Sequence, residues 1–297
     1  FVVPLVGGIA VAAAGVKHVQ NVGERSNTTL DILSVVLLAA GITAFVYSVG
    51  EFSTNLIAGI VALFAAIVLL GLFAARQLKL EHPVLNVRPM ASVRFWPACL
   101  LVVVSMMTTF SMSVLLPLYF EGAYGMTALV AGLLILPAIA CNAVTSIVGG
   151  RVMDARGAWP LLPVGFALIA VGQTAISMTA TSMNIGVVVA LTVVVYAGVG
   201  LVLSPSQTAG LETLPAAEHP HGTALLNTWN MIAASFGPSL FIGLLSSSAA
   251  TAGAAGAATD VAQAIGFATA VRVAAVIAVV GFATSLVYAR RESHMSH

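Results

Sequence analysis

The sequence predicts an all-helical integral membrane protein, and three observations support this fold class. The 297-residue chain is 60% hydrophobic, with a mean hydropathy of +1.06, whereas soluble domains are roughly 45–50% apolar. Only 7% of its residues are charged, which is too few to cover the surface of a soluble globule. Its apolar runs have the length of membrane-crossing helices, about 20 residues each, which excludes the short alternating strands of a membrane barrel.

Nine apolar segments are long enough to be membrane spans. They cover residues 1–16, 31–50, 54–75, 95–119, 126–150, 160–181, 184–205, 222–248 and 268–289. Between them we expect a cytoplasmic loop at 17–30, a polar cytoplasmic connection at 76–94 and a cytoplasmic tail at 291–297. The chain opens at Phe1 inside an apolar run, without an initiator Met or a basic leader segment. We therefore expect that the start of a longer protein is missing.

Lysine and arginine predict the orientation of the spans, because basic residues favour cytoplasmic loops. If the first span runs from outside to inside, ten of the eleven basic residues fall in cytoplasmic segments. The remaining one, Arg272, lies near the outer end of the last span. A single miscounted helix would scramble this alternation, so the charge pattern also supports the number of spans.

The composition also excludes several classes of function. The net charge of +1 gives no field that would attract nucleic acid, and the expected partner is the lipid bilayer. Cys99 and Cys141 both lie inside apolar runs, which favours small core residues over a disulfide or a metal site. We find no metal-ligand spacing, phosphate loop or nucleophile motif, so the sequence predicts no enzyme, metal or organic cofactor.

The stretch "GGRVMDARGAW", residues 149–159, places three charges between two long apolar runs. We expect it to form a tight cytoplasmic turn between the spans 126–150 and 160–181. Arg151 and Arg156 would anchor such a turn to the inner membrane face. Asp154 requires another explanation, because acidic residues contribute little to topology.

The spacing Gly150-x-x-x-Asp154-x-x-Gly157 resembles motif A of the major facilitator superfamily. In that family the acidic residue interacts with neighbouring helix ends and basic groups, and so stabilises one transport conformation. This sequence departs from the motif at its basic pair, where Ala158 and Trp159 stand. The resemblance implies a cytoplasmic gate made of Gly150, Asp154, Arg156 and Gly157.

A second stretch, "GVGLVLSPSQTAGLETLPAAEHPHGTALLNTWNMIAASFGPSLFIGLL" at 198–245, resembles one region of the fourteen-helix drug:proton antiporters of the EmrB/QacA group, especially the lincomycin-resistance type. The matching residues are Gly198, Gly200, Pro205, Gln207, Thr208, Gly210, Leu214, Pro215, the run Pro220 to Ala224, Asn227 and Thr228. Residues 119–139 also fit the family's loop into its tenth helix. The nine spans would then be helices six to fourteen: residues 1–16 end the N-terminal half, 31–75 form two linker helices, and 95–290 form the C-terminal half.

The resemblance implies a monomeric efflux transporter of the bacterial cytoplasmic membrane. It would exchange protons for drugs or other amphipathic molecules by alternating access, with the proton gradient as its energy source and without a cofactor. Two alternatives remain open at this point. The cargo could be an endogenous metabolite or lipid precursor, or the chain could be a truncated product that does not transport.

Polar side chains within the spans are the candidates for a substrate cavity between the two halves. Thr108 and Met112 belong to a span rich in hydroxyls and thioethers, Asn142 lies in the next span, and Asn227 and Asn230 share one helix face. For each of them, packing against a neighbouring helix is the alternative role. Pro205, Gly237 and Pro238 are predicted to bend their helices.

No carboxylate is predicted in the middle of a span, although proton coupling requires a titratable group there. Asp31 and Glu212 lie only at span edges, where caps or loop charges are the alternative. Members of the family carry important coupling residues in the N-terminal half, so we expect the coupling groups of this protein there.

Overall fold

The computed structural model describes residues 8, 31–51, 55–80, 83–158 and 160–293. The chain divides into two units, residues 1–31 and 32–297. All the described residues except Gly8 and Asp31 belong to the second unit. The predicted span 1–16 and loop 17–30 lie outside the described residues, apart from Gly8.

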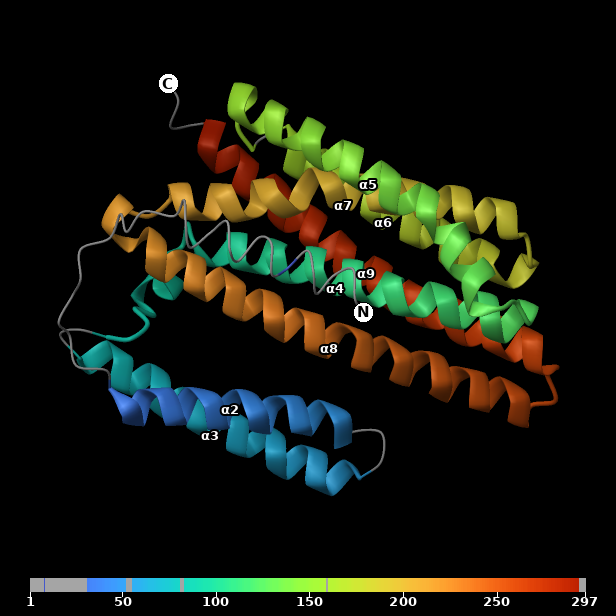
Figure 1. Ribbon diagram of the computed structural model, residues 1–297, viewed down its shortest axis with the longest axis horizontal. Helices are drawn as coiled ribbons and strands as arrows, with labels where there is room; N and C mark the ends of the chain where they lie inside the picture. The colour runs from blue at the N-terminus through green and yellow to red at the C-terminus, as the bar shows by residue number, and fades with distance from the viewer. Residues whose placement is uncertain (1–7, 9–30, 52–54, 81–82, 159, 294–297) are drawn as a thin grey trace. The chain divides into compact units, whose positions relative to one another are not determined.

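Helices make up all the regular structure of the described part (Figure 1). The long helices are α2 (Ile32–Glu51), α3 (Leu56–Lys79), α4 (Trp96–Tyr124), α5 (Ala128–Arg156), α6 (Leu161–Thr179), α7 (Ile185–Glu212), α8 (His219–Ala254) and α9 (Thr259–Ser293). Short 3₁₀ turns are η1 (Arg88–Ala91), η2 (Ala180–Ser182) and η3 (Ala216–Glu218). Among the described residues, eight helices are long and apolar enough to cross a membrane. They coincide with eight of the nine predicted spans, and the all-helical membrane fold is confirmed.

Several helices extend beyond the predicted spans. The ends are set by residues that interrupt the backbone: Gly125 follows α4 with φ 63° and Gly157 follows α5 with φ 73°, a left-handed conformation that favours glycine. Hydropathy marks where a helix leaves the lipid, whereas these glycines mark where the helix itself ends. The charged last turn of α5 was therefore predicted, wrongly, to be a turn.

Helices α4 to α9 pack into one bundle, in which α4 lies against α7, α8 and α9, and α6 lies between α7 and α9 (Figure 1). In α4, 67% of the apolar segment is buried, against 17% in α5. The large apolar side chains that α5 leaves exposed include Leu129 and Val144, which suits a surface facing lipid rather than water.

Glycines bring α5, α6 and α7 into close contact. A Cβ at Gly198 would lie 2.6 Å from the carbonyl oxygen of Gly165 in α6. A Cβ at Gly200, on the opposite side of α7, would lie 2.7 Å from the carbonyl oxygen of Asn142 in α5. The pair Gly198-x-Gly200 therefore allows α7 to approach both neighbours closely, as small residues do at membrane helix interfaces.

At one end of the bundle, aromatic side chains join α4 to α9. The ring of Tyr119 in α4 stacks on that of Phe267 in α9, with centroids 4.2 Å apart. Its hydroxyl donates to the carbonyl oxygen of Ala180 at 2.7 Å, which ties α4 to the end of α6. At the opposite end, the hydroxyl of Tyr288 in α9 donates to the carbonyl oxygen of Ala209 in α7 at 2.9 Å.

Helices α2 and α3 form an antiparallel pair beside α8 (Figure 1). Gln77 in α3 is buried and uses both ends of its amide. Its Nε2 donates to the Ser34 hydroxyl in α2 at 2.6 Å, and its Oε1 accepts the Leu85 backbone N–H at 3.0 Å. The pair is thereby joined to the chain that leads into α4.

The connection between α3 and α4 lies against the start of the bundle. The backbone N–H of Asn86 donates to Nδ1 of His221 in α8 at 3.4 Å. The sulfur of Met90 accepts from the indole Nε1 of Trp229 in α8 at 3.4 Å and from the thiol of Cys99 in α4 at 3.8 Å. These contacts hold the connection against both α4 and α8.

The basic residues of the described part gather at one end of this unit. Six of them lie at the end of α3, on η1, just before α4 or at the end of α5: Arg76, Lys79, Arg88, Arg94, Arg151 and Arg156. The predicted position of Arg272 near the outer end of its span is corrected, because α9 begins at Thr259, thirteen residues earlier. Arg272 lies well inside α9, exposed on the same face as Val276 and Val280.

Candidate functional site

The charged stretch 149–159 is mostly helical. Arg151, Asp154 and Arg156 lie in the last two turns of α5, and the backbone N–H of Gly157 donates to the carbonyl oxygen of Met153 at 2.8 Å to close the helix. Gly149, one residue before the motif, faces α7, where a Cβ would lie 3.3 Å from the carbonyl oxygen of Gly200. A Cβ at Gly150 would meet no atom within 4 Å.

Asp154 occupies a position that its own helix disfavours. It is exposed in the last turn of α5, where the helix dipole places partial negative charge, and a carboxylate there costs about 0.3–1 kcal/mol. Within the described part of the chain it forms no hydrogen bond or ion pair. The arrangement leaves a carboxylate, at the end of the bundle where the basic residues gather, that is available to a cationic or N–H partner.

Two predicted cavity residues lie in the core of the bundle instead. Thr108 is 2% exposed and Met112 is 0% exposed, so their burial does not support the predicted cavity position. The exposed side of α4 at this level carries Phe110 and Ser113, whose hydroxyl donates to the Phe110 carbonyl oxygen at 2.8 Å. Hydropathy could not distinguish these faces, because hydroxyls occur on both.

Asn142 joins α5 to α7. Its Nδ2 donates to the backbone carbonyl oxygen of Tyr196 at 3.0 Å. The neighbouring hydroxyl of Thr145 donates within α5, to the carbonyl oxygens of Cys141 and Asn142 at 2.9 and 3.1 Å. Of the two roles considered for Asn142, the structure shows helix packing.

Asn227 lies in a pocket between α2 and α8. The pocket has a volume of about 250 Å³ and is lined by Ile42, Phe45, Val46, Asn227, Thr228, Met231, Ile232 and Ser235. Asn230 is half-buried on α8 and is not among these lining residues. Of the two asparagines that the sequence placed on one face, only Asn227 is therefore in the lining of this pocket.

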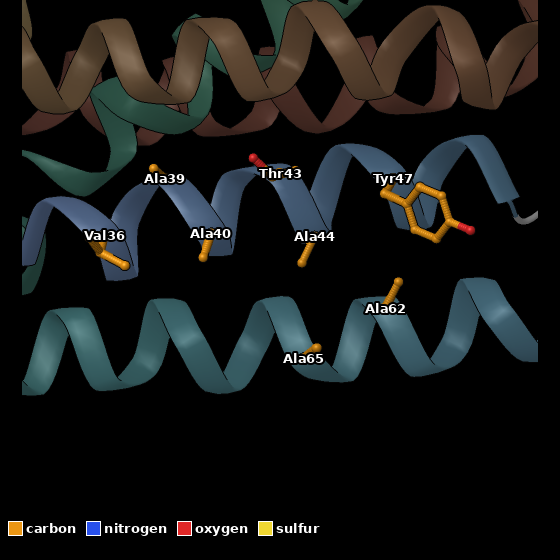
Figure 2. A pocket seen from close by; sticks show the side chains of 8 residues that line it. All are labelled: Val36, Ala39, Ala40, Thr43, Ala44, Tyr47, Ala62 and Ala65. Atoms are coloured by element: carbon orange, nitrogen blue, oxygen red, sulfur yellow. The ribbon is translucent and has the colours of Figure 1, made fainter. Parts of the chain in front are cut away.

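A second hollow, of about 650 Å³, lies between α2 and α3 and is shown in Figure 2. Ala40 and Ala44 of α2 point toward Ala62 and Ala65 of α3, so its floor is made of methyl groups. The only side-chain polar atoms of its described lining are the hydroxyls of Thr43 and Tyr47. This surface suits lipid chains rather than specific recognition.

The predicted bends at proline are not breaks in the helices. Helix α7 continues seven residues past Pro205 to Glu212, so Gln207 and Thr208 do not mark the end of the helix. Helix α8 runs unbroken through Gly237 and Pro238. Gly237 has a packing role, because a Cβ there would lie 3.2 Å from the Cα of Met107 in α4.

Sequence reasoning missed Gln173. It is the one glutamine within α6, it is 0% exposed, and neither end of its amide has a hydrogen-bond partner among the described residues. Its occurrence in an otherwise apolar helix was the available signal, because a polar side chain within a membrane is costly unless it is satisfied.

The described carboxylates lie in the first or last turn of a helix or outside the long helices. Glu51, Glu121, Asp154 and Glu212 end their helices, and Asp260 begins one. The described part of the chain thus has no acid in the middle of a membrane-spanning helix, as the sequence predicted. It also contains no group of three or more His, Cys, Asp or Glu side chains that could hold a metal ion.

Comparison with known proteins gives a family match over most of the chain. A model of the Major Facilitator Superfamily matches residues 5–238. The lincomycin resistance protein LmrB of Listeria monocytogenes is 31% identical over 235 residues, which cover 78% of this chain and 50% of that protein. LmrB of Bacillus subtilis is 30% identical over 239 residues, covering 78% and 49%.

A further relative covers more of the chain. The uncharacterized MFS-type transporter YcnB of Bacillus subtilis is 32% identical over 271 residues, which cover 90% of this chain and 57% of that protein. The chain spans about half the length of the curated relatives it matches.

Proposed function

The chain belongs to the Major Facilitator Superfamily, a family of membrane transporters, and on this basis we propose that it supplies helices six to fourteen of a fourteen-helix drug:proton antiporter. The cargo would be drugs or other small amphipathic molecules, exported across a bacterial cytoplasmic membrane by alternating access. The proton gradient would supply the energy. Relatives named for lincomycin resistance support this cargo class.

The position of Asp154 carries the proposal. An exposed carboxylate at the carbonyl end of α5 is disfavoured by the dipole of its own helix, so its presence calls for a partner beyond the described residues. A basic group or a helix N-terminus of the other half would provide one in a single transport conformation. Asp154 would then stabilise that conformation and set the balance between the two access states.

The distribution of acids supports a coupling group outside the described residues. The carboxylates of the described part lie in the first or last turns of helices or outside the long helices, and none lies in the middle of a span. A coupling acid must change its exposure between the two access states. We therefore expect proton binding in the N-terminal half, with α4 to α9 supplying one wall of the substrate path.

The test is export of a fluorescent cationic dye and of a lincosamide from cells that carry the full-length protein. Asp154→Asn should slow export severalfold, because it removes the charge that holds the gate. Asp260→Asn makes the same chemical change at the opposite end of the bundle, where Asp260 lies in the first turn of α9 and accepts the Val261 N–H at 2.9 Å. That variant should export normally, because the amide oxygen of asparagine can accept the same N–H.

Three outcomes would count against parts of this proposal. Normal export by Asp154→Asn would mean that the charges of the stretch 149–159 set only the membrane topology and take no part in a gate. A well-folded protein that moves neither compound would favour a dedicated exporter of a metabolite or lipid precursor. Export that continues after the proton gradient is collapsed would remove the antiport mechanism.

A further inference from the structure

The pocket between α2 and α8 lies in the cytoplasmic half of the bundle. Asn227 is eight residues along α8 from His219, which corresponds to about 12 Å. Ser235, at the far end of the lining, is sixteen residues from the same point, or about 24 Å. The pocket therefore lies at the depth of the inner leaflet and ends near the middle of the 36-residue helix.

Asn227 is the one polar side chain of the described lining that makes no hydrogen bond within the described part of the chain. The Thr228 hydroxyl donates to the carbonyl oxygen of Ala224 at 2.8 Å, and the Ser235 hydroxyl donates to that of Met231 at 3.0 Å. The amide of Asn227 makes no hydrogen bond within the described part of the chain. An amide offers two N–H donors and a carbonyl acceptor, and leaving these unpaired within a membrane is costly.

The other side chains that line the pocket indicate what the rest of the ligand must be: apolar and without charge. Ile42, Phe45 and Val46 form the α2 wall, and Met231 and Ile232 continue the apolar surface along α8. The rings of Phe45 and Phe236 lie 6.3 Å apart and join the two helices beside the pocket. Among the described residues, no charged side chain lines the pocket, so nothing in this lining would neutralise an ionic headgroup.

The volume is also informative. At about 250 Å³ the pocket is slightly smaller than the roughly 300–1,000 Å³ of sites that enclose a whole drug-sized ligand. Val46 and Met231 are 45% and 68% exposed, so the pocket is open at its rim. It can hold one end of a molecule while the rest remains among the lipid chains.

We propose that the pocket between α2 and α8 binds uncharged amphipathic small molecules that enter from the inner leaflet. The Asn227 amide forms a hydrogen bond with their hydroxyl, amide or carbonyl group. The apolar side chains of α2 and α8 that line the pocket contact the apolar part of these molecules. The occupant is a transport substrate rather than a phospholipid, since a phosphate headgroup would find no cation in the described lining. The inference rests on the proposed export function and adds a site on the linker helices at which cargo is first captured.

The test measures binding directly, by photolabelling of the full chain in lipid nanodiscs. The probe is a long-chain aliphatic alcohol bearing a diazirine, and its attachment sites are mapped by peptide mass spectrometry. We expect labelling of α2 and α8 within 42–46 and 227–235. Asn227→Leu should reduce it about tenfold through loss of the hydrogen bond, and Met231→Trp should abolish it by filling the pocket.

Two variants control for changes in helix surface that lie outside the pocket. Ser239→Leu makes a polar-to-apolar change on α8, and Val61→Trp adds a ring to an exposed position of α3 that is 63% exposed. Both should label like the unmodified chain. Equal loss of labelling in these controls and in Asn227→Leu would overturn the proposal, because the effect would then not be local.

Separate outcomes distinguish this proposal from the function on which it rests. If the full-length protein exports dye but the probe does not label the pocket, the site is wrong and the export function stands. If the pocket is labelled as expected and no compound is exported, the site stands and the export function fails. Stronger labelling by a diazirine-bearing phosphatidylglycerol than by the alcohol would make this a lipid site and overturn the proposal.

Discussion

Asn142 and Asn227 are the same residue type in similarly apolar helices, yet the structure uses their amides differently. Asn142 faces α7, where Gly200 lets the two backbones approach closely, and its Nδ2 reaches the Tyr196 carbonyl oxygen at 3.0 Å. Asn227 faces α2 across a pocket of about 250 Å³ and reaches no protein partner in the described part. One amide fastens two helices, and the other is left free.

The difference between the two asparagines comes from the facing helix. A carbonyl of a helix backbone can accept a further hydrogen bond only if the donor helix approaches closely, and small residues permit this. Helix α7 presents Gly200 to α5, whereas α2 presents Ile42, Phe45 and Val46 at its crossing with α8. Bulky side chains keep the second pair of helices apart, which leaves both a pocket and an unbonded amide.

The largest expected effect comes from removing the close approach itself. Gly200→Ala should destabilise the protein by about 3 kcal/mol, because the new methyl group would meet the Asn142 carbonyl oxygen, the Ser146 backbone nitrogen and the Thr145 hydroxyl. Gly243→Ala in α8 is the matched control, since a Cβ there meets no atom within 4 Å. It should be neutral or slightly stabilising. Thermal unfolding in detergent would measure both, and equal melting temperatures would refute the tight crossing.

A third amide, Gln173, extends the comparison, because it is buried and has no hydrogen-bond partner among the described residues. Gln173→Met should stabilise the protein by about 1–2 kcal/mol, because it replaces an unsatisfied buried amide by an apolar side chain of similar volume. Gln77→Met is the control, and its expected change in stability has the opposite sign. Gln77 is 1% exposed and uses both ends of its amide, so its loss should destabilise. A Gln173→Met variant that melts lower would mean that the amide has a partner, such as an internal water.

The two asparagines can be compared directly by the same substitution. Asn142→Leu should cost about 1 kcal/mol through loss of the bond to α7 and should leave photolabelling of the α2–α8 pocket intact. Asn227→Leu should cost nothing in stability and should lose the labelling. The measurement is a melting curve and a labelling yield for each variant. If both variants lose stability equally, Asn227 also has a packing role and the contrast disappears.

The smallest expected effect concerns the connection between α3 and α4, which contacts α8 through Met90. Met90→Leu removes the sulfur that accepts the Trp229 indole N–H at 3.4 Å and keeps the apolar volume. It should lower the stability by about 0.5 kcal/mol, and should weaken probe binding only slightly. Met153→Leu, at a methionine for which no such contact occurs in the described part, should leave both values unchanged. A large loss of labelling in Met90→Leu would show that this connection positions the pocket wall.

Much of the fold could be predicted from composition and spacing. Continuous apolar runs can be satisfied in lipid only as helices, because the backbone must bond internally. The orientation indicated by the basic residues stays a prediction. The ends of the helices were less predictable. Asp154 belongs to the last turn of α5 rather than to a turn, because the helix continues beyond the lipid to Gly157, whose left-handed conformation ends it.

The roles of the candidate site residues could be predicted less well than the fold. The sequence identified the polar residues within the spans, but Thr108 and Met112 proved to be buried and Asn142 proved to be bonded to a neighbouring helix. In a membrane helix both faces are apolar, so periodicity does not show which face meets protein and which meets a cavity. Gln173 was overlooked for the same reason.

The sequence by itself therefore determined the helical membrane fold and the family resemblance, because the first depends on transfer of residues into lipid and the second on motif spacing. Only the tertiary structure decided which polar side chains are satisfied. That depends on the distance between helices, which Gly200 reduces between α5 and α7 and which Phe45 and its neighbours increase between α2 and α8. A free amide and a pocket arise together where two helices cannot come close.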